Sequence, residues 1–221
     1  MLQAVTAAAV LKTYGITLAR GGAVFARLPD IALRAGQSLA LLGPSGSGKT
    51  TALMALAGVY PPASGRIEIA DTDLWSLGPH ARDRFRGQRI GLVFQSFHLV
   101  DALTVGGNLA LASTCAGLSP DRERMDRLLE RLDVQSVRNK RADRISHGQA
   151  QRVAVLRALV NNPVLVLADE PTSALDDENA SALLKLLRET SSEAGAALVV
   201  ASHDKRVIGA VDTVVHIERA S

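Results

Sequence analysis

An octapeptide in the first quarter of the chain constrains its fold more than any other feature: Gly43-Pro44-Ser45-Gly46-Ser47-Gly48-Lys49-Thr50. It matches the pattern G-x-x-x-x-G-K-[ST] at every fixed position. The apolar run Ser38 to Leu42 before it suits a buried strand, and Lys49 to Ala57 after it suits a helix. This order brings backbone N–H groups together at a helix N-terminus, where phosphate binds well. Residues 43–50, called the P-loop below, are therefore predicted to bind phosphate.

Further short apolar runs alternate with helical patterns along the chain. The runs are Ile90 to Phe94, Val164 to Ala168, Ala197 to Ala201 and Val211 to Ile217, and helices are expected over 148–159 and 177–189. This alternation predicts a mainly parallel sheet with helices on its faces. The segment before Ser38 and the run Gly65 to Ala70 predict a small antiparallel sheet beside it.

The composition changes between Phe97 and Ser146, where the strand-like runs stop. Pro120 opens a charged amphipathic stretch whose apolar face carries Met125, Leu128, Leu129 and Leu132. We expect a single domain over residues 1–221, in which a core and β subdomain (1–96 and 147–221) receive an inserted helical subdomain (about 97–146). The fold class is therefore α/β, with a mainly parallel core sheet, a small antiparallel β subdomain and an inserted helical subdomain.

Composition argues against several classes of protein. The formal net charge is only +3 and the charges are interleaved, so no nucleic-acid partner is expected. A lone Cys115 can form neither an intrachain disulfide nor a cysteine-based zinc site. The run Ala4 to Leu11 suits a strand, and no run approaches the roughly 20 apolar residues that span a bilayer. We expect a cytoplasmic chain that meets the membrane's inner face only through another polypeptide.

The P-loop side chains suit the binding of a nucleotide together with Mg²⁺. Lys49 is expected to reach the β- and γ-phosphates, Thr50 to place its hydroxyl on Mg²⁺, and Thr51 to donate to the α-phosphate. Guanine recognition by N-K-x-D is not expected, because the only Asn-Lys pair, Asn139-Lys140, is followed by Arg141 and Ala142. The cofactors expected are ATP and Mg²⁺, in a P-loop NTPase.

A second candidate site follows the run Val164 to Ala168, which ends in Asp169 and Glu170. Ligands of open α/β sheets sit at the carboxyl ends of strands. Asp169 is therefore expected to hold Mg²⁺ through water, and Glu170 to orient or deprotonate the water that attacks the γ-phosphate. Alone the pair could merely cap a helix, but beside the P-loop it is a strong signal. The two motifs together fit any P-loop NTPase.

The segment Ile145-Ser146-His147-Gly148-Gln149-Ala150-Gln151-Arg152-Val153-Ala154 resembles the L-S-G-G-Q signature of ABC ATPases and its Q-R-V-A continuation. Other stretches resemble further motifs of that family in the family's order. Val93-Phe94-Gln95 is similar to the Q-loop, Ser173-Ala174-Leu175-Asp176 to the D-loop, and Ser202-His203-Asp204 to the switch-histidine loop. The resemblance covers nearly the whole chain. Within it, the segment Arg89 to Leu99 is similar to the ATPases of lipoprotein-releasing, macrolide-export and cell-division complexes.

The resemblance implies roles for particular residues. Gln95 would sense Mg²⁺ and the attacking water, and His203 would hydrogen-bond the γ-phosphate. Tyr14 stands where the family places the aromatic residue that stacks on adenine, although an ordinary core or surface tyrosine is the alternative. Signature residues Ser146, Gly148 and Gln149 would donate to the ATP held by a second copy, so a head-to-tail dimer is implied, together with a membrane permease partner.

Two signature positions depart from the family, and several questions stay open. Ile145 replaces the signature leucine. His147 replaces the first signature glycine; it could add a donor to phosphate, or its bulk could weaken the closed dimer. Phe97 and Leu99 are either an exposed grip for the permease or core residues. Alternative functions are mechanotransmission through a membrane partner, which the sequence does not separate from transport, and a non-transport ABC ATPase, whose coiled-coil, zinc or tandem features are missing. Cargo, its direction, the partner and homodimer or heterodimer assembly also stay open.

Overall fold

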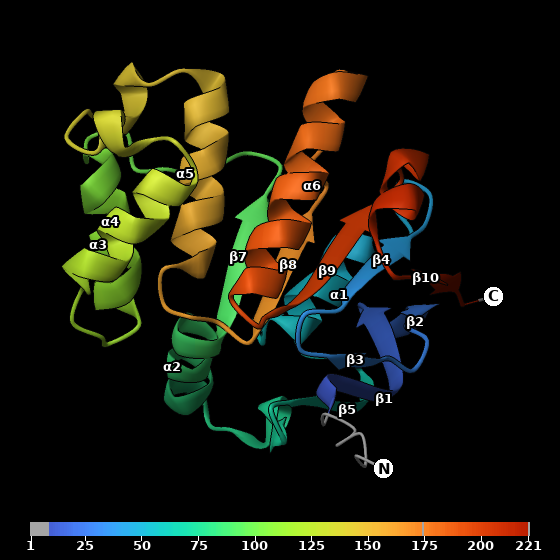
Figure 1. Ribbon diagram of the computed structural model, residues 1–221. Helices are drawn as coiled ribbons and strands as arrows, with labels where there is room; N and C mark the ends of the chain where they lie inside the picture. The colour runs from blue at the N-terminus through green and yellow to red at the C-terminus, as the bar shows by residue number, and fades with distance from the viewer. Residues whose placement is uncertain (1–8, 174, 221) are drawn as a thin grey trace, which may run out of the picture.

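The computed structural model describes residues 9–173 and 175–220, which build two sheets and the helices around them (Figure 1). The larger sheet has the order β10 (Thr213–His216), β4 (Ser38–Leu42), β9 (Ala197–Ser202), β8 (Leu165–Asp169) and β7 (Ile90–Phe94). Every neighbouring pair in it is parallel, which confirms the predicted parallel core. All five strands fall on the apolar runs that indicated it.

A smaller antiparallel sheet lies beside the parallel one, as expected. Its strands are β1 (Ala9–Arg20), β2 (Ala23–Arg27), β3 (Ala32–Arg34), β5 (Ser64–Ile69), β6 (Thr72–Asp73) and β11 (Glu218–Arg219). The turn at Gly21 and Gly22 joins β1 to β2, and both glycines have positive φ. Positions 4–8 of the predicted first strand, like Ala174, lie outside the described residues.

The helices are α1 (Lys49–Leu56), α2 (Pro79–Arg89), α3 (Val105–Cys115), α4 (Arg122–Arg131), α5 (His147–Leu159) and α6 (Asp177–Glu193). Short 3₁₀ turns are η1 (Leu74–Ser76), η2 (Gln135–Val137), η3 (Ala142–Arg144) and η4 (Lys205–Ala210). The sequence did not predict α2, because it has no apolar stripe and none of its described residues is buried. Its start does carry a signal, Pro79 at the first helical turn.

Two hydrophobic clusters lie on opposite faces of the parallel sheet. Leu41, Leu167 and Val199 point to one face and pack with α1 between the two sheets. Their neighbours Ala40, Val166 and Val200 point to the other face, in the cluster that includes residues of α5 and α6. Because side chains alternate along a strand, the helix that follows the P-loop and the helix of the signature lie on opposite faces of one sheet.

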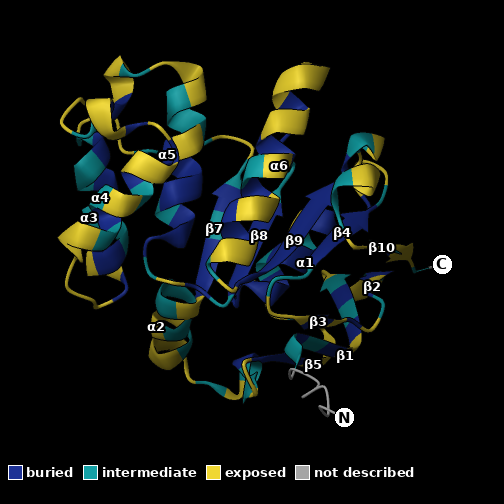
Figure 2. Ribbon diagram, in the orientation of Figure 1, coloured by how far each residue is buried: buried dark blue, intermediate teal, exposed yellow. Residues whose placement is uncertain are grey.

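The helical part packs as its sequence pattern predicts (Figure 2). Met125, Leu129 and Leu132 are buried and Leu128 is partly buried, in the same cluster as residues of α3 and α5. Gly91 of β7 allows α5 to approach the sheet, since a Cβ there would lie 2.3 Å from the carbonyl oxygen of Ala158. None of the helices in the described part of the chain is long and apolar enough to cross a membrane.

Candidate functional site

The predicted site residues gather where the parallel strands end. The P-loop follows β4, Asp169 ends β8, His203 follows β9 and Gln95 follows β7. The register pairs Leu42 with Ser202, Asp169 with Ala201, and Phe94 with Asp169, so all these strands end at one level. In Figure 1 their carboxyl ends point to the upper edge of the sheet.

The P-loop backbone leaves donors free at the start of α1. Gly48 takes the N-cap position with φ 101°, a conformation that disfavours other residues, and no described side chain caps the helix. A Cβ at Gly43 would lie 2.4 Å from the Ser47 hydroxyl oxygen. That buried hydroxyl has no hydrogen-bond partner among the described residues. The first N–H groups of α1 are therefore available to an anion.

Lys49 is buried, and its ammonium already bonds other groups of the same chain. Its ammonium donates to the carbonyl oxygens of Gly43 (2.8 Å) and Pro44 (3.1 Å). The same Nζ lies 3.3 Å from Oε1 of Glu170, with side-chain exposures of 6% and 15%. Such a partly buried pair is screened less than a surface pair, so the attraction is strong. A phosphate can compete with Glu170 for this ammonium.

Glu170 is held by groups from the end of β9. The Ser202 hydroxyl donates to its Oε2 (3.0 Å), and Nδ1 of His203 lies 2.9 Å from its Oε1. Burial acts to raise the pKa of Glu170, but the bonds from His203, Ser202 and Lys49 outweigh it and leave the pKa below its ordinary value. Glu170 also has φ 46°, a rare conformation that concentrates at functional sites. The carboxylate is thus ionised and fixed, as a proton acceptor requires.

Asp169 and Thr50 form the part of the site that suits a divalent cation. The Thr50 hydroxyl donates to Oδ1 of Asp169 at 3.2 Å. Burial, with the nearby charge of Glu170, raises the pKa of Asp169 against the bond from Thr50. A cation would offset that poorly solvated charge. Among the described residues no cluster of three His, Cys, Asp or Glu could hold a metal, so an ion here would need water or phosphate oxygens as further ligands.

A cavity of about 890 Å³ opens beside the P-loop. Residues of the P-loop and Glu170 form one wall of the cavity. Another wall is lined by Arg20, Phe25, Val59 and Tyr60. The Tyr60 hydroxyl donates to the carbonyl oxygen of Ala19 at 3.1 Å. The cavity therefore continues from a phosphate cradle to a wall of flat and apolar side chains that suits a nucleotide base.

Tyr14 does not lie at this cavity, which corrects its expected place. It is 46% exposed and is not among the described residues that line the cavity. Its hydroxyl donates to Glu68 at 3.3 Å, and the Arg66 guanidinium lies 5.9 Å from its ring centre. The reason is the irregular course of β1, whose pairing with β5 shifts register between Tyr14 and Thr17. Arg20, at the other end of β1, reaches the cavity instead.

The signature residues lie at the exposed start of α5. Ser146 is its N-cap: its hydroxyl accepts from the Gln149 N–H (3.3 Å), and the Gln149 side chain accepts from the Ser146 N–H (3.0 Å). A Cβ at Gly148 would meet nothing within 4 Å in the described structure. Ser146, Gly148 and Gln149 are not among the described residues that line the P-loop cavity. The structure thus keeps the two predicted halves of the site apart within one chain.

The segment after Gln95 is tied to α5. Gln95 itself is exposed, whereas Phe97 and Leu99 are half-buried, and Leu99 packs against the core. Arg157 of α5 donates to the carbonyl oxygens of Phe97 (2.8 Å) and His98. The rings of Phe97 and His147 lie 4.9 Å apart at 59°. Leu99 therefore fits the interpretation as a core residue better than that of an exposed contact for the permease. Phe97 contacts the signature residue His147.

Some residues of the site carried no assignment from the sequence. Ser202 was recognised only as part of a motif, yet it bonds Glu170 directly. Arg20, Phe25 and Tyr60 reach the cavity from segments whose sequence shows no nucleotide signal. Only the turn glycines after Arg20 mark that place in the sequence.

Known proteins resemble this chain over most of its length. A family model described as ABC transporter matches residues 29–173. The lipoprotein-releasing system ATP-binding protein LolD of Anaeromyxobacter dehalogenans is 40% identical over 191 residues, covering 85% of this chain and 80% of the relative. An uncharacterized ABC transporter ATP-binding protein of Mycobacterium tuberculosis is also 40% identical, over 190 residues and 85% of this chain, which spans only 57% of that relative's length.

Solved structures agree in fold. CbiO1 of Clostridium perfringens, described as part of the ABC transporter complex cbiONQ, superposes with a TM-score of 0.85 at 28% identity, covering 96% of this chain and 85% of that one. The cassette MJ0796, as a dimer bound to ADP and Pi, gives 0.80 at 29% identity and 94% coverage of both chains. With the P-loop, the carboxylate pair and the signature in the order described, the chain belongs to the ABC transporter family as an ATP-binding domain.

Proposed function

We propose that this chain binds and hydrolyses ATP as the ATPase subunit of an ABC transporter. The observation that carries the proposal is the contact of Lys49 and His203 with Glu170 at the mouth of the P-loop cavity. Glu170 has the fixed, ionised carboxylate that can take a proton from water. Lys49 has the ammonium that can bind phosphate.

Phosphate binding and base catalysis share these groups. The β- and γ-phosphates would replace Glu170 as the partner of Lys49, while the free N–H groups of α1 and the Ser47 hydroxyl bind further oxygens. Glu170, released from Lys49 and still held by Ser202, would orient the attacking water. His203 would then turn from Glu170 toward the γ-phosphate. Mg²⁺ bound with ATP neutralises charge that develops on the phosphates, and Thr50, Asp169 and Gln95 would hold it.

The base and ribose would lie along the wall of Arg20, Phe25, Val59 and Tyr60. A planar guanidinium and an aromatic ring both offer a flat surface to a purine. The wall has no described acidic or amide side chain that would single out guanine. The proposal therefore gives the adenine contact to this wall in place of Tyr14.

A second copy, head to tail, would complete the site. The start of α5 is exposed, and Ser146, Gly148 and Gln149 could donate to the γ-phosphate held by the partner. The dimeric form of MJ0796 with ADP and Pi supports this arrangement. LolD and cbiO1 are each named as part of a transport system, so we also propose a membrane permease partner and a place on the membrane's inner face.

The experiment is ATP hydrolysis by the purified chain at rising protein concentration. We expect the specific rate to rise with concentration and to fall about 100-fold or more in Glu170→Gln, since a general base contributes roughly that much. Glu189→Gln, a carboxylate on the exposed face of α6, is the matched control and should keep the rate. A rate independent of concentration would remove the second copy from the proposal. A rate equal to that of Glu170→Gln would remove hydrolysis by this chain alone.

A further inference from the structure

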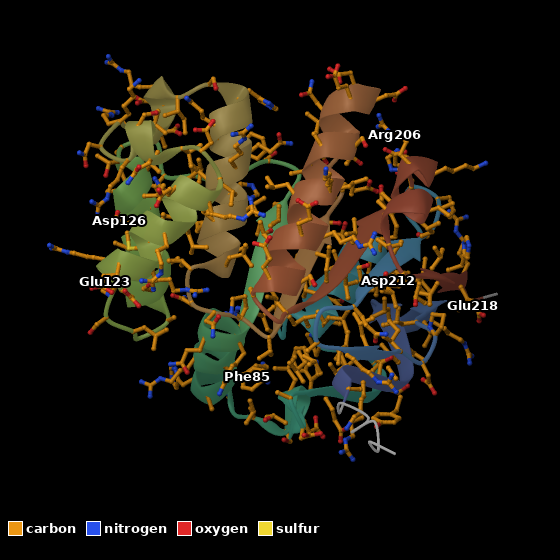
Figure 3. All side chains as sticks on the ribbon, viewed as in Figure 1. Phe85, Glu123, Asp126, Arg206, Asp212 and Glu218 are labelled. Atoms are coloured by element: carbon orange, nitrogen blue, oxygen red, sulfur yellow. The ribbon has the colours of Figure 1, made fainter. Side chains whose placement is uncertain are left out.

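Arg206 lies in η4 and is labelled in Figure 3. Its side chain connects two segments that are far apart in the sequence. Its guanidinium donates from Nε to Oδ2 of Asp204 at 2.6 Å and from Nη1 to Oδ1 of Asp177 at 2.7 Å. A longer bond runs from Nη1 to the carbonyl oxygen of Leu175 at 3.4 Å. Leu175 and Asp177 flank Asp176, the last residue of the predicted D-loop. One side chain therefore joins the D-loop to the segment after His203.

The chain of hydrogen bonds continues from Arg206 to Glu170, the proposed general base. Asp204 accepts from the Thr172 hydroxyl at 3.1 Å, and its own N–H donates to the Ser202 hydroxyl oxygen at 3.0 Å. That hydroxyl donates to Glu170 at 3.0 Å. A continuous line of polar contacts thus runs from Asp177 at the start of α6 to the carboxylate of Glu170.

A simpler role for Arg206 would be to support its own 3₁₀ turn. Asp204 is the N-cap of η4 and already accepts from the Arg206 backbone N–H at 2.9 Å, so the cap does not need the guanidinium. The Nη1 group instead leaves the turn and reaches α6. The Asp177 side chain is 94% exposed, so an ion pair there contributes little to stability. The geometry fits a positioning role better than a stabilising one.

We propose that Arg206 is a positioning residue for ATP hydrolysis: it fixes the D-loop relative to Glu170 and His203 through Asp204. This inference rests on the proposed function. Burial acts to raise the pKa of Asp204, but the bonds from Arg206 and Thr172 outweigh it and hold that pKa below its ordinary value. Asp204 is therefore an anionic acceptor for the arginine, whose Nε and Nη2 both lie 2.6 Å from its Oδ2.

The test compares Arg206→Gln, Arg206→Lys and Asp177→Asn. We expect Arg206→Gln to lower kcat about 10-fold with KM for ATP changed less than about 2-fold, because a small misplacement of a catalytic group costs rate more than binding. Arg206→Lys keeps the charge and should recover part of the rate, and Asp177→Asn should lower kcat by less. The control is Arg131→Gln, which breaks a comparable arginine–carboxylate pair with Glu193, distant in sequence from the site residues.

Hydrogen–deuterium exchange of the same variants, without nucleotide, tests the link independently of hydrolysis. We expect faster exchange in Arg206→Gln over residues 175–180 and 203–206, and unchanged exchange over the P-loop. Unchanged exchange in the first two segments overturns the inference, even if the wild type hydrolyses no ATP and the proposed function fails by itself. If the wild type is active, an unchanged kcat, or equal losses in kcat and ATP affinity with lower thermal stability, also overturns it.

Discussion

The P-loop side and the signature side of the molecule differ in how their polar groups are satisfied. On the P-loop side, Lys49 and His203 each contact Glu170, across segments that are far apart in the sequence. On the signature side, the side chains of Ser146 and Gln149 each bond the backbone N–H of the other residue, at an exposed helix start. One side is a preformed cradle and the other is an exposed surface, which is the contrast that the proposed head-to-tail dimer would use.

The difference also separates two kinds of chemistry. The P-loop side combines an ammonium with an ionised carboxylate, so it can both bind an anion and accept a proton. The signature side offers a helix N-terminus and a hydroxyl, which can stabilise negative charge. Changes on the first side should therefore affect nucleotide binding by one chain, whereas changes on the second should affect only events that need two chains.

The largest expected effect comes from Lys49→Met, which keeps the length of the side chain and removes its charge. We expect ATP to bind at least about 100-fold more weakly, because two charge-assisted bonds to phosphate are lost. The measurement is a titration of the purified chain with a fluorescent ATP analogue, at a concentration low enough to keep it monomeric.

Lys185→Met is the matched control, since Lys185 is 75% exposed on α6 and forms only a long contact with Glu189. Its affinity should equal that of the wild type. If Lys49→Met also bound the analogue normally, the cradle would not be the phosphate site, and the contrast between the two sides would lose its basis.

The local parts of the site were predictable from the sequence. The P-loop and the Asp169-Glu170 pair are short, contiguous segments whose geometry follows from a strand that enters a turn and a helix. The parallel sheet followed from the apolar runs, and the inserted helices followed from the face that carries Met125 and Leu129. In each case the pattern that carries the prediction lies within one short segment of the sequence.

The parts that escaped prediction depend on contacts between distant segments. Tyr14 and Arg20 both belong to β1, and which of them reaches the cavity depends on register shifts that the sequence does not show. The reach of Arg206 to Asp177 spans 29 positions and depends on how η4 packs against α6. The helix α2 packs with too few apolar residues to show a period.

A smaller effect is expected for Ser146→Ala on the signature side. Loss of the N-cap bond should lower the free energy of unfolding by about 1 kcal/mol. The rate of hydrolysis at high protein concentration should fall about 10-fold, because the hydroxyl can no longer bond phosphate on the partner. The ATP analogue should bind the monomer as tightly as the wild type does, in contrast to Lys49→Met.

The control for Ser146→Ala is Asp121→Ala, which removes the N-cap of α4 and its bond from the Arg124 N–H (3.0 Å). It should cost similar stability, about 1 kcal/mol, with no loss of rate. An equal loss of rate in both variants would mean that Ser146 acts through helix stability alone. Weaker binding of the analogue to Ser146→Ala would mean that the signature contributes to the site of its own chain.

The smallest effect is expected for His147→Ala, which tests whether the signature side is tied to its own chain. Loss of the ring contact with Phe97 should cost about 1 kcal/mol, offset by a few tenths because alanine favours the helix, so about 0.5 kcal/mol remains. A double-mutant cycle with Phe97→Leu in urea unfolding measures the coupling. If the two changes are additive, the ring contact does not hold the signature, and the segment after Gln95 is held by the bonds from Arg157 and the packing of Leu99. If they are coupled, the unusual histidine fastens the signature to that segment, and the two sides are less independent than their hydrogen bonds indicate.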